Sequence, residues 1–224
     1  MLYPQDWGES MILREKYFID IHKGATGIFM ILLMYIYGTW DSVTSWVYLA
    51  LHGTYGILWI SKSIIFPDTT WEQKTSIWYG LYIWFGLTLY WSSGWIINSG
   101  FFNDSLPQIA PPWLIGLCVS MFGLGVFLHF SADMYKHTML TQRPGNLISD
   151  GIMGKCRNIN YFGELMIYLS FALLAMHWLP LLFLGLMMAI VWLPNMIRKD
   201  RSLSRYSDFE RYKKKSKLFI PYIF

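Results

Sequence analysis

Long apolar runs recur along the chain and restrict the folds open to it. Six can be drawn, near residues 24–40, 43–66, 75–98, 112–132, 161–178 and 180–197. A helix that crosses a bilayer needs roughly 20 mostly apolar residues. Only 14% of the residues are charged, against about 25% in an ordinary soluble domain. Because backbone groups in hydrocarbon must be hydrogen-bonded internally, and alternation is too weak for a barrel, we predict an all-α polytopic membrane helix bundle with about six transmembrane helices.

The lysines and arginines are distributed asymmetrically around these runs. Counted through six spans, all 18 of them fall on one side of the membrane. The opposite loops, 39–42, 99–111 and the turn at 179–180, contain none. Positive residues mark the cytoplasmic face. We therefore expect both termini to be cytoplasmic, in the endoplasmic reticulum of a eukaryote or the inner membrane of a bacterium.

The chain is predicted to form one integral membrane domain, residues 1–224, since no internal repeat stands out. Its start lacks the basic end, apolar run and cleavage site of a secretory signal peptide. Cys118 and Cys156 show no CxxC spacing, so neither a disulfide nor a metal site is expected. The expected surroundings are a lipid bilayer without nucleic acid, and the oligomeric state is left open.

The first polar constellation is HFSADMYKH, residues 129–137. His129 and Asp133 are four residues apart, and Lys136 and His137 follow Asp133 by three and four. On a helix these positions share one face. Two interpretations are open: a solvated helix end with an Asp133–Lys136 ion pair, or a polar wall facing a cavity, because ionisable residues at membrane depth tend to mark sites.

The second constellation is CRNINYFGE, residues 156–164, directly before an apolar run. It brings together Arg157, Asn160, Tyr161 and Glu164. A helix cap explains the asparagine and the acid. Helix N-termini beside arginines also suit phosphate groups, so an anion site is the alternative.

A third pattern runs through residues 51–62, where His52, Tyr55, Trp59 and Lys62 form one helical stripe. Aromatic stripes usually serve packing. A histidine and a tyrosine hydroxyl inside a membrane helix nevertheless need polar partners. His52 and Tyr55 are therefore candidate proton donors to a substrate carbonyl.

The basic tail, residues 198–217, has two open interpretations. A polybasic segment beside a membrane contacts anionic lipid. The spacing of Leu203, Tyr206, Phe209 and Tyr212 favours an amphipathic helix packed on the domain, whose basic face would then contribute to a polyanion pocket.

The last hundred residues resemble a known family. NINYFGE, the closing DFERYKKKSKLFIPYIF and the HFSAD run are similar to the signatures of the steroid 5-alpha-reductase and sterol-reductase superfamily. The resemblance covers roughly residues 125–224. It implies a C-terminal cofactor-binding region and a role in lipid metabolism: an NADPH-dependent oxidoreductase that reduces a carbon–carbon double bond of a lipid or steroid-like substrate.

The resemblance also implies a cofactor pocket at the cytoplasmic side. It places around the nucleotide Asp133, Arg143, Arg157, Asn160, Glu164 and Arg198. The neighbouring His129, Lys136 and Tyr161 complete the predicted cofactor-binding set, while Tyr55 and His52 are the predicted catalytic residues.

Two departures keep alternatives open. Steroid 5-alpha-reductases pair a glutamate of their first helix with a tyrosine of the second, and the run 24–40 contains no acid. The related isoprenylcysteine carboxyl methyltransferases use S-adenosylmethionine and carry RHPxYxG, where this chain reads RNINYFG. A methyltransferase acting on a lipid or prenylated substrate is therefore the second hypothesis, and a non-catalytic membrane scaffold the third.

Overall fold

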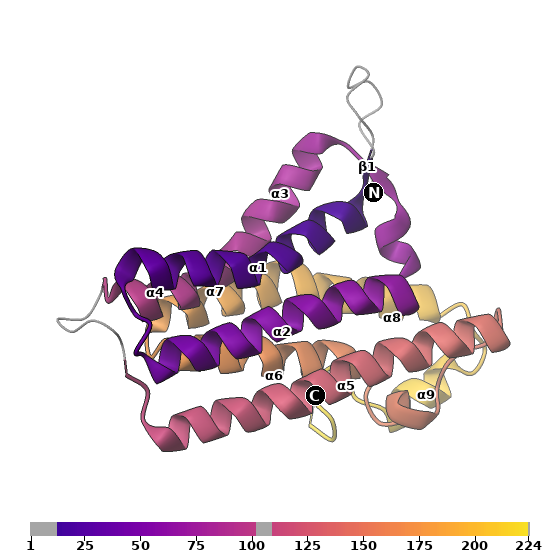
Figure 1. Ribbon diagram of the computed structural model, residues 1–224. Helices are drawn as coiled ribbons and strands as arrows, with labels where there is room; N and C mark the ends of the chain where they lie inside the picture. The colour runs from indigo at the N-terminus through magenta and orange to yellow at the C-terminus, as the bar shows by residue number, and fades with distance from the viewer. Residues whose placement is uncertain (1–12, 102–108, 224) are drawn as a thin grey trace.

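The computed structural model describes residues 13–101 and 109–223, and nearly all of its regular structure is helical (Figure 1). In chain order the elements are β1 (Leu13–Arg14), α1 (Glu15–Tyr37), α2 (Val43–Ile65), η1 (Thr69–Glu72), β2 (Lys74–Thr75), α3 (Ile77–Thr88), η2 (Leu89–Trp91), α4 (Ser92–Ser99), α5 (Pro112–Gln142), η3 (Gly151–Met153), α6 (Ile159–Leu174), α7 (Trp178–Met187), the π-helical turn η4 (Met188–Trp192), α8 (Leu193–Leu203) and α9 (Phe209–Lys215). The strands β1 and β2 form one short antiparallel pair. The predicted helical fold class is confirmed for these residues.

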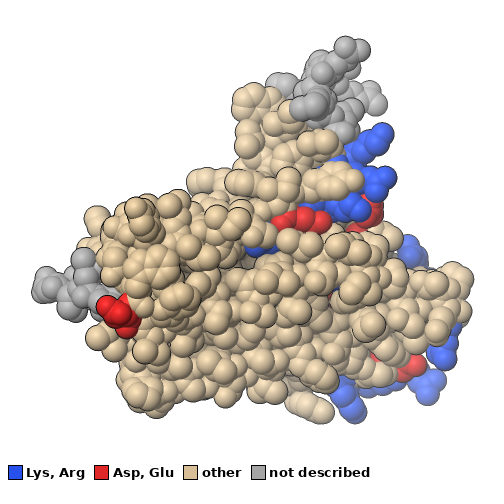
Figure 2. Space-filling model, in the orientation of Figure 1, with Lys and Arg blue, Asp and Glu red and all other residues tan. Residues whose placement is uncertain are grey.

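Three helices are long and apolar enough to cross a membrane: Glu15–Tyr37, Pro112–Gln142 and the continuous helix Trp178–Leu203. A helix lies in each of the six predicted runs, while the count of six crossings and the cytoplasmic termini stay predictions. Lys and Arg side chains gather at one end of the molecule, near β1, α8 and α9, and the flank in view is almost free of charge (Figure 2). This distribution is that of a protein whose basic end lies outside the hydrocarbon.

Several predicted helix boundaries are wrong, because an apolar run shows which residues suit the hydrocarbon and not where the helix begins or ends. Helix α1 begins at Glu15 rather than at residue 24, so it includes Asp20, and α5 continues through the expected loop as far as Gln142. The run 75–98 is divided into α3, η2 and α4. At this bend Trp91 stacks on Phe29, with ring centroids 4.2 Å apart.

The tail is packed on the domain, as predicted, but as two helices rather than one. Helix α8 ends at Leu203 and α9 begins at Phe209. Phe209 and Tyr212 are buried, and the Tyr212 hydroxyl donates to the Met153 carbonyl at 2.7 Å. The predictions about the chain's first residues and the centre of the loop 99–111 lie outside the described residues.

Glycines allow α1 and α2 to approach closely. A Cβ on Gly56 would lie 2.2 Å from the Lys23 carbonyl oxygen, and a Cβ on Gly24 would lie 2.8 Å from the Ile60 side chain. Small residues at the contact between two helices are typical of tightly packed membrane proteins. The contact presses Lys23 against the inner face of α2.

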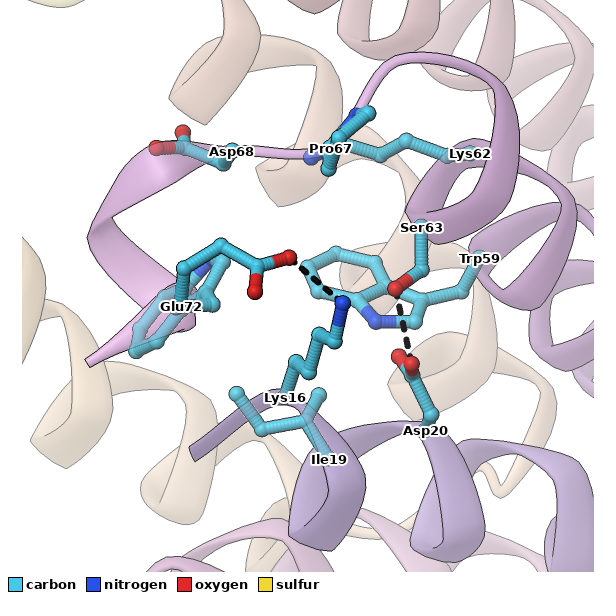
Figure 3. Close-up of a pocket in the computed structure, with 10 residues that line it drawn as sticks. Lys16, Ile19, Asp20, Trp59, Lys62, Ser63, Pro67, Asp68 and Glu72 are labelled. Carbon is cyan, nitrogen blue, oxygen red and sulfur yellow. Dashed lines mark hydrogen bonds and ion pairs between the residues drawn. The ribbon is translucent and has the colours of Figure 1, made fainter. Parts of the chain in front are cut away.

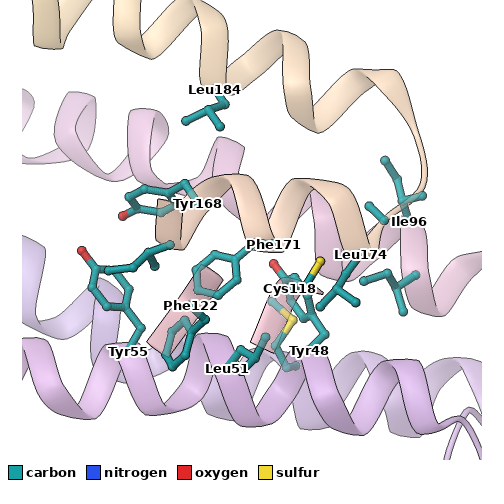
Figure 4. Packing of buried hydrophobic residues seen from close by; sticks show 14 of the residues in the cluster. Tyr48, Leu51, Tyr55, Ile96, Cys118, Phe122, Tyr168, Phe171, Leu174 and Leu184 are labelled. Carbon is teal, nitrogen blue, oxygen red and sulfur yellow. The ribbon is translucent and has the colours of Figure 1, made fainter. Parts of the chain in front are cut away.

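The core contains a layer of aromatic residues between α2, α5 and α6 (Figure 4). Tyr55 and Phe171 are fully buried, and Tyr55 and Tyr168 lie at the same edge of the cluster. Rings 4.5–7 Å apart in tilted or edge-on geometry add to burial energy. The layer fixes the position of α2 relative to α6, which carry the polar groups described below.

The ion pair between Asp68 and Lys136 joins the α2–η1 connection to α5, with Nζ 3.0 Å from Oδ2. Burial would raise the pKa of Asp68, but the Lys136 ammonium and the Thr70 amide outweigh it and lower that pKa to about 2. A carboxyl with a depressed folded pKa stabilises the fold above its unfolded pKa and loses this contribution as the pH falls through the folded value.

We therefore expect Asp68→Asn to lower the free energy of unfolding at pH 7 by about 1 kcal/mol or less. The difference from wild type should disappear as the pH falls from about 4 to about 2. Thermal unfolding of both proteins across this range measures it, with the exposed Asp41→Asn as the control. A difference that stays constant with pH would contradict the assignment.

Candidate functional site

Asp133 is a buried carboxylate at the centre of a polar cluster between α2, α5 and α6. The Lys62 ammonium forms an ion pair with it, and both side chains are about 5% exposed. The Asn160 amide donates to Asp133 Oδ1 at 3.1 Å, and His129 Nε2 lies 3.8 Å from Oδ2. Three elements therefore converge on one carboxylate, while the predicted cavity in front of this face of α5 stays a prediction.

Two buried polar atoms in this cluster have no hydrogen-bond partner within the described chain, His129 Nε2 and Asn160 Oδ1. His129 Nδ1 lies 3.1 Å from the Asn160 carbonyl, so it carries the proton and leaves Nε2 as an acceptor. Unsatisfied buried polar atoms are rare and call for an explanation. A ligand with amide or hydroxyl donors would satisfy both.

A second polar centre, around Tyr55 and Glu164, lies beside Trp59. The Tyr55 hydroxyl lies 3.4 Å from Glu164 Oε1, to which it donates, and Glu164 is half-buried. The ammonium groups of Lys23 and Lys62 lie 4.4 and 4.6 Å from the centre of the Trp59 ring. The indole therefore contacts both ammonium groups and links the Glu164 centre to the Asp133 cluster.

A pocket opens beside this indole, between the start of α1 and the end of α2 (Figure 3). Its cavity volume is only about 10 Å³, and it is lined by Lys16, Ile19, Asp20, Trp59, Lys62, Ser63, Pro67, Asp68, Trp71 and Glu72. Lys16 pairs with Glu72 at 2.5 Å, and the Ser63 hydroxyl donates to Asp20 at 2.7 Å. The pocket connects the exterior of the basic end with Trp59 and Lys62.

The predicted phosphate-binding arginines fall into two groups. Arg143, which caps the end of α5, and Arg198, in the middle of α8, are both exposed. Arg157 is buried, forms a bidentate pair with Asp200 at 2.9–3.1 Å and donates to the Ser216 carbonyl. Its guanidinium hydrogens are already bonded to protein groups of α8 and the tail. Arg157 therefore holds the tail in place and is not open to a ligand.

Neighbours of Arg157 add to this attachment of the tail. Lys199 donates to the Arg157 carbonyl at 2.8 Å, and the Asn158 amide donates to the Leu218 carbonyl at 2.8 Å. Cys156 donates to the Phe219 carbonyl at 3.1 Å, and burial raises the pKa of its thiol. Cys118 and Cys156 are both free and buried, and no metal-binding group of histidine, cysteine or acidic residues is found among the described residues.

The other predicted residues are placed as follows. Lys136 pairs with Asp68, so the alternative Asp133–Lys136 ion pair is wrong. Tyr161 packs near Trp192, with ring centroids 5.8 Å apart. His52 hydrogen-bonds to the Tyr48 hydroxyl at 2.8 Å and stacks on Phe171, so the structure does not bring it to the Tyr55–Glu164 contact.

Sequence reasoning missed Lys23 and Tyr168. Lys23 is 4% exposed and donates to the Tyr168 hydroxyl at 2.5 Å. It directly precedes the first apolar run and was therefore assigned to the cytoplasmic flank. The signal that could have revealed it is the pair of matching motifs KGATG and HGTYG, whose glycines predict close helix contact.

Comparison with protein families gives one match. The family model described as 3-oxo-5-alpha-steroid 4-dehydrogenase matches residues 77–224, which is more than half of the chain. No curated protein matches the chain. The matched region includes α5 and α6, and therefore Asp133, Asn160 and Glu164.

Proposed function

Because the chain belongs to the 3-oxo-5-alpha-steroid 4-dehydrogenase family, we propose that it uses NADPH to reduce a carbon–carbon double bond in a lipid or steroid-like substrate. The family consists of reductases that act on such bonds, so the chain is an oxidoreductase of the steroid reductase type. The match does not favour the methyltransferase or the scaffold hypothesis.

The observation that carries this proposal is the Tyr55–Glu164 contact beside the Asp133 cluster. It places a phenol, which can donate a proton, next to a half-buried carboxylate and an aromatic wall. The acid is on α6, whereas the family pattern implied by resemblance has it on the first helix. Reduction of a polarised double bond requires a hydride donor and a proton donor, and this cluster supplies the second.

The residues present fit a nicotinamide dinucleotide. The unpartnered His129 Nε2 and Asn160 Oδ1 are both acceptors, which suits the two N–H groups of a carboxamide. The exposed guanidinium groups of Arg143 and Arg198 suit phosphates. Asp133 is on α5 and Arg143 caps the end of that helix, about 15 Å further along its axis, so the cofactor would extend along α5. NADPH, when bound, supplies the hydride.

The chain's own residues have distinct parts in the proposed mechanism. Tyr55 donates the proton to the substrate, and Glu164 orients its hydroxyl and exchanges protons with solvent because it is half-buried. Lys62 and Asn160 hold Asp133 in place. The buried rings around Tyr55 exclude water, which strengthens each electrostatic contact.

Titration of the detergent-purified protein with NADPH, NADH and S-adenosylmethionine tests the proposal by thermal unfolding. We expect NADPH to raise the apparent Tm, with about 2.7 kcal/mol of stabilisation at a hundredfold excess over its Kd, and S-adenosylmethionine to leave it unchanged. Stabilisation by S-adenosylmethionine alone would transfer the chain to the methyltransferase hypothesis. No response to any of the three would contradict both enzyme hypotheses.

A further inference from the structure

Lys23 is a cation inside the bundle that the mechanism above does not use. It is 4% exposed and belongs to the apolar helix Glu15–Tyr37. A charged side chain at such a position is expensive and tends to be kept for function. Among the described residues it has no ion-pair partner within 4 Å, whereas Lys62 is paired with Asp133.

The surroundings of Lys23 are phenols and an indole. Its ammonium donates to the Tyr168 hydroxyl at 2.5 Å and lies 4.3 and 4.4 Å from the ring centres of Tyr55 and Trp59. The other charges that act on it are Glu164, which attracts it, and Lys62, which repels it. An ammonium has three donors, and the described hydrogen bond uses one of them.

The backbone holds this arrangement in place. The Lys23 carbonyl lies against Gly56 so closely that a side chain there would clash with it. Tyr168 stacks on Tyr90, with ring centroids 3.9 Å apart, and meets Tyr55 edge-on. Lys23 and Tyr168 are therefore preorganised, which is the condition under which fixed donors stabilise a developing charge most strongly.

We propose that Lys23 is a catalytic residue whose ammonium, together with the Tyr168 hydroxyl, binds the substrate's carbonyl oxygen. This assignment rests on the proposed reductase function. Tyr168 accepts a hydrogen bond from Lys23 and also hydrogen-bonds to Tyr55, so its hydroxyl hydrogen would turn from Tyr55 to the substrate oxygen when substrate binds. The Lys23 ammonium and the Tyr168 hydroxyl are then two donors, one of them charged, that lie close to Tyr55, the proposed proton donor.

The reaction balances with these groups. When bound, the reduced nicotinamide would supply a hydride to the β-carbon. The C=C electron pair would then form the C=C bond of an enolate, and the carbonyl pair would move onto oxygen. Lys23 and Tyr168 stabilise that oxyanion without losing their protons. Tyr55 then gives a proton to the α-carbon, the carbonyl re-forms, and a proton from solvent by way of Glu164 restores Tyr55.

The test uses the full-length protein in detergent with two probes, progesterone and trans-2-hexadecenal, each labelled with ¹³C at the carbonyl. The variants are Lys23→Met, which keeps length without charge, Lys23→Arg, which keeps charge, and Tyr168→Phe. Lys74→Met, at an exposed position on β2, is the matched control. Turnover with NADPH and the infrared carbonyl frequency of the bound probe without cofactor are both measured.

We expect Lys23→Met to lower kcat about 10²–10³-fold with little change in KM, and Lys23→Arg to retain part of the rate. The carbonyl frequency of the bound probe should be lowered by wild type and Lys74→Met, and should return toward its free value in Lys23→Met and Tyr168→Phe. A purely structural lysine would change the thermal stability but not this frequency.

The outcomes separate the two proposals. A lowered carbonyl frequency that depends on Lys23 in a protein without turnover would support the carbonyl site and contradict the reductase function. Turnover with an unchanged frequency and kcat in Lys23→Met would overturn the carbonyl site alone. If Lys23→Met does not fold, an unaltered frequency and kcat in Tyr168→Phe would overturn it, and so would failure of wild type to bind either probe.

Discussion

Replacing Glu164 by glutamine is expected to lower kcat/KM by about 10²–10³-fold and, because the family resemblance places Glu164 beside the nucleotide, to abolish the stabilisation of the protein by NADPH. Glutamine has the same shape but no charge, so the Tyr55 hydroxyl loses its anionic acceptor. A charge-assisted hydrogen bond is roughly twice as strong as a neutral one. The negative charge of Glu164 also attracts the ammonium of Lys23, and the substitution removes this attraction.

The fold should survive this substitution. Glu164 is half-buried, and it makes no ion pair within 4 Å in the described part of the chain. The matched control is Glu210→Gln on the exposed side of α9, which should keep both NADPH stabilisation and activity. Unchanged NADPH affinity in Glu164→Gln, measured by the shift of the apparent Tm, would refute the assignment of Glu164 to the cofactor site.

The helical architecture could be predicted because one physical requirement dominates it. Backbone groups in hydrocarbon must be satisfied within each segment, so apolar runs become helices, and each predicted run contains one. Helix ends could not be predicted from the same signal. Helices α1 and α5 extend into polar sequence, to Glu15 and Gln142, because hydrogen bonding along a helix does not stop where hydropathy does.

The candidate site was predictable where it depends on spacing within one helix. His129 and Asp133 share a face of α5, as their four-residue interval indicates. Contacts between helices were not predictable in this way. The sequence offers no indication that Asp133 selects Lys62 rather than Lys136, because that choice depends on how α2 packs against α5.

The acid that contacts Tyr55 shows the same division. The run 24–40 has none, and the structure places the acid beside Tyr55 on α6, as Glu164. The first helix contributes Lys23 at this centre instead. The proton-donating and carbonyl-binding roles are therefore divided among Tyr55, Tyr168 and Lys23 in the proposed mechanism.

Replacing Asp133 by alanine is expected to have the largest effect on stability. It leaves the buried ammonium of Lys62 without its counter-charge, and removing one partner of a buried pair costs about 3–5 kcal/mol. For a chain of this size the apparent Tm should fall by about 6–20 °C. Asn160 also loses its acceptor, which adds an unsatisfied amide to the cost.

The double variant Lys62→Met with Asp133→Leu separates loss of the pair from loss of packing. Replacing both ions by apolar side chains is often neutral for stability, so most of the lost Tm should return. NADPH stabilisation should not return, because Asn160 would no longer be held by the carboxylate. If Asp133→Ala alone lowers the apparent Tm by less than about 2 °C, the Lys62–Asp133 pair is not buried as described. Recovered stability without recovered NADPH binding would show that this buried pair serves the cofactor site rather than the fold.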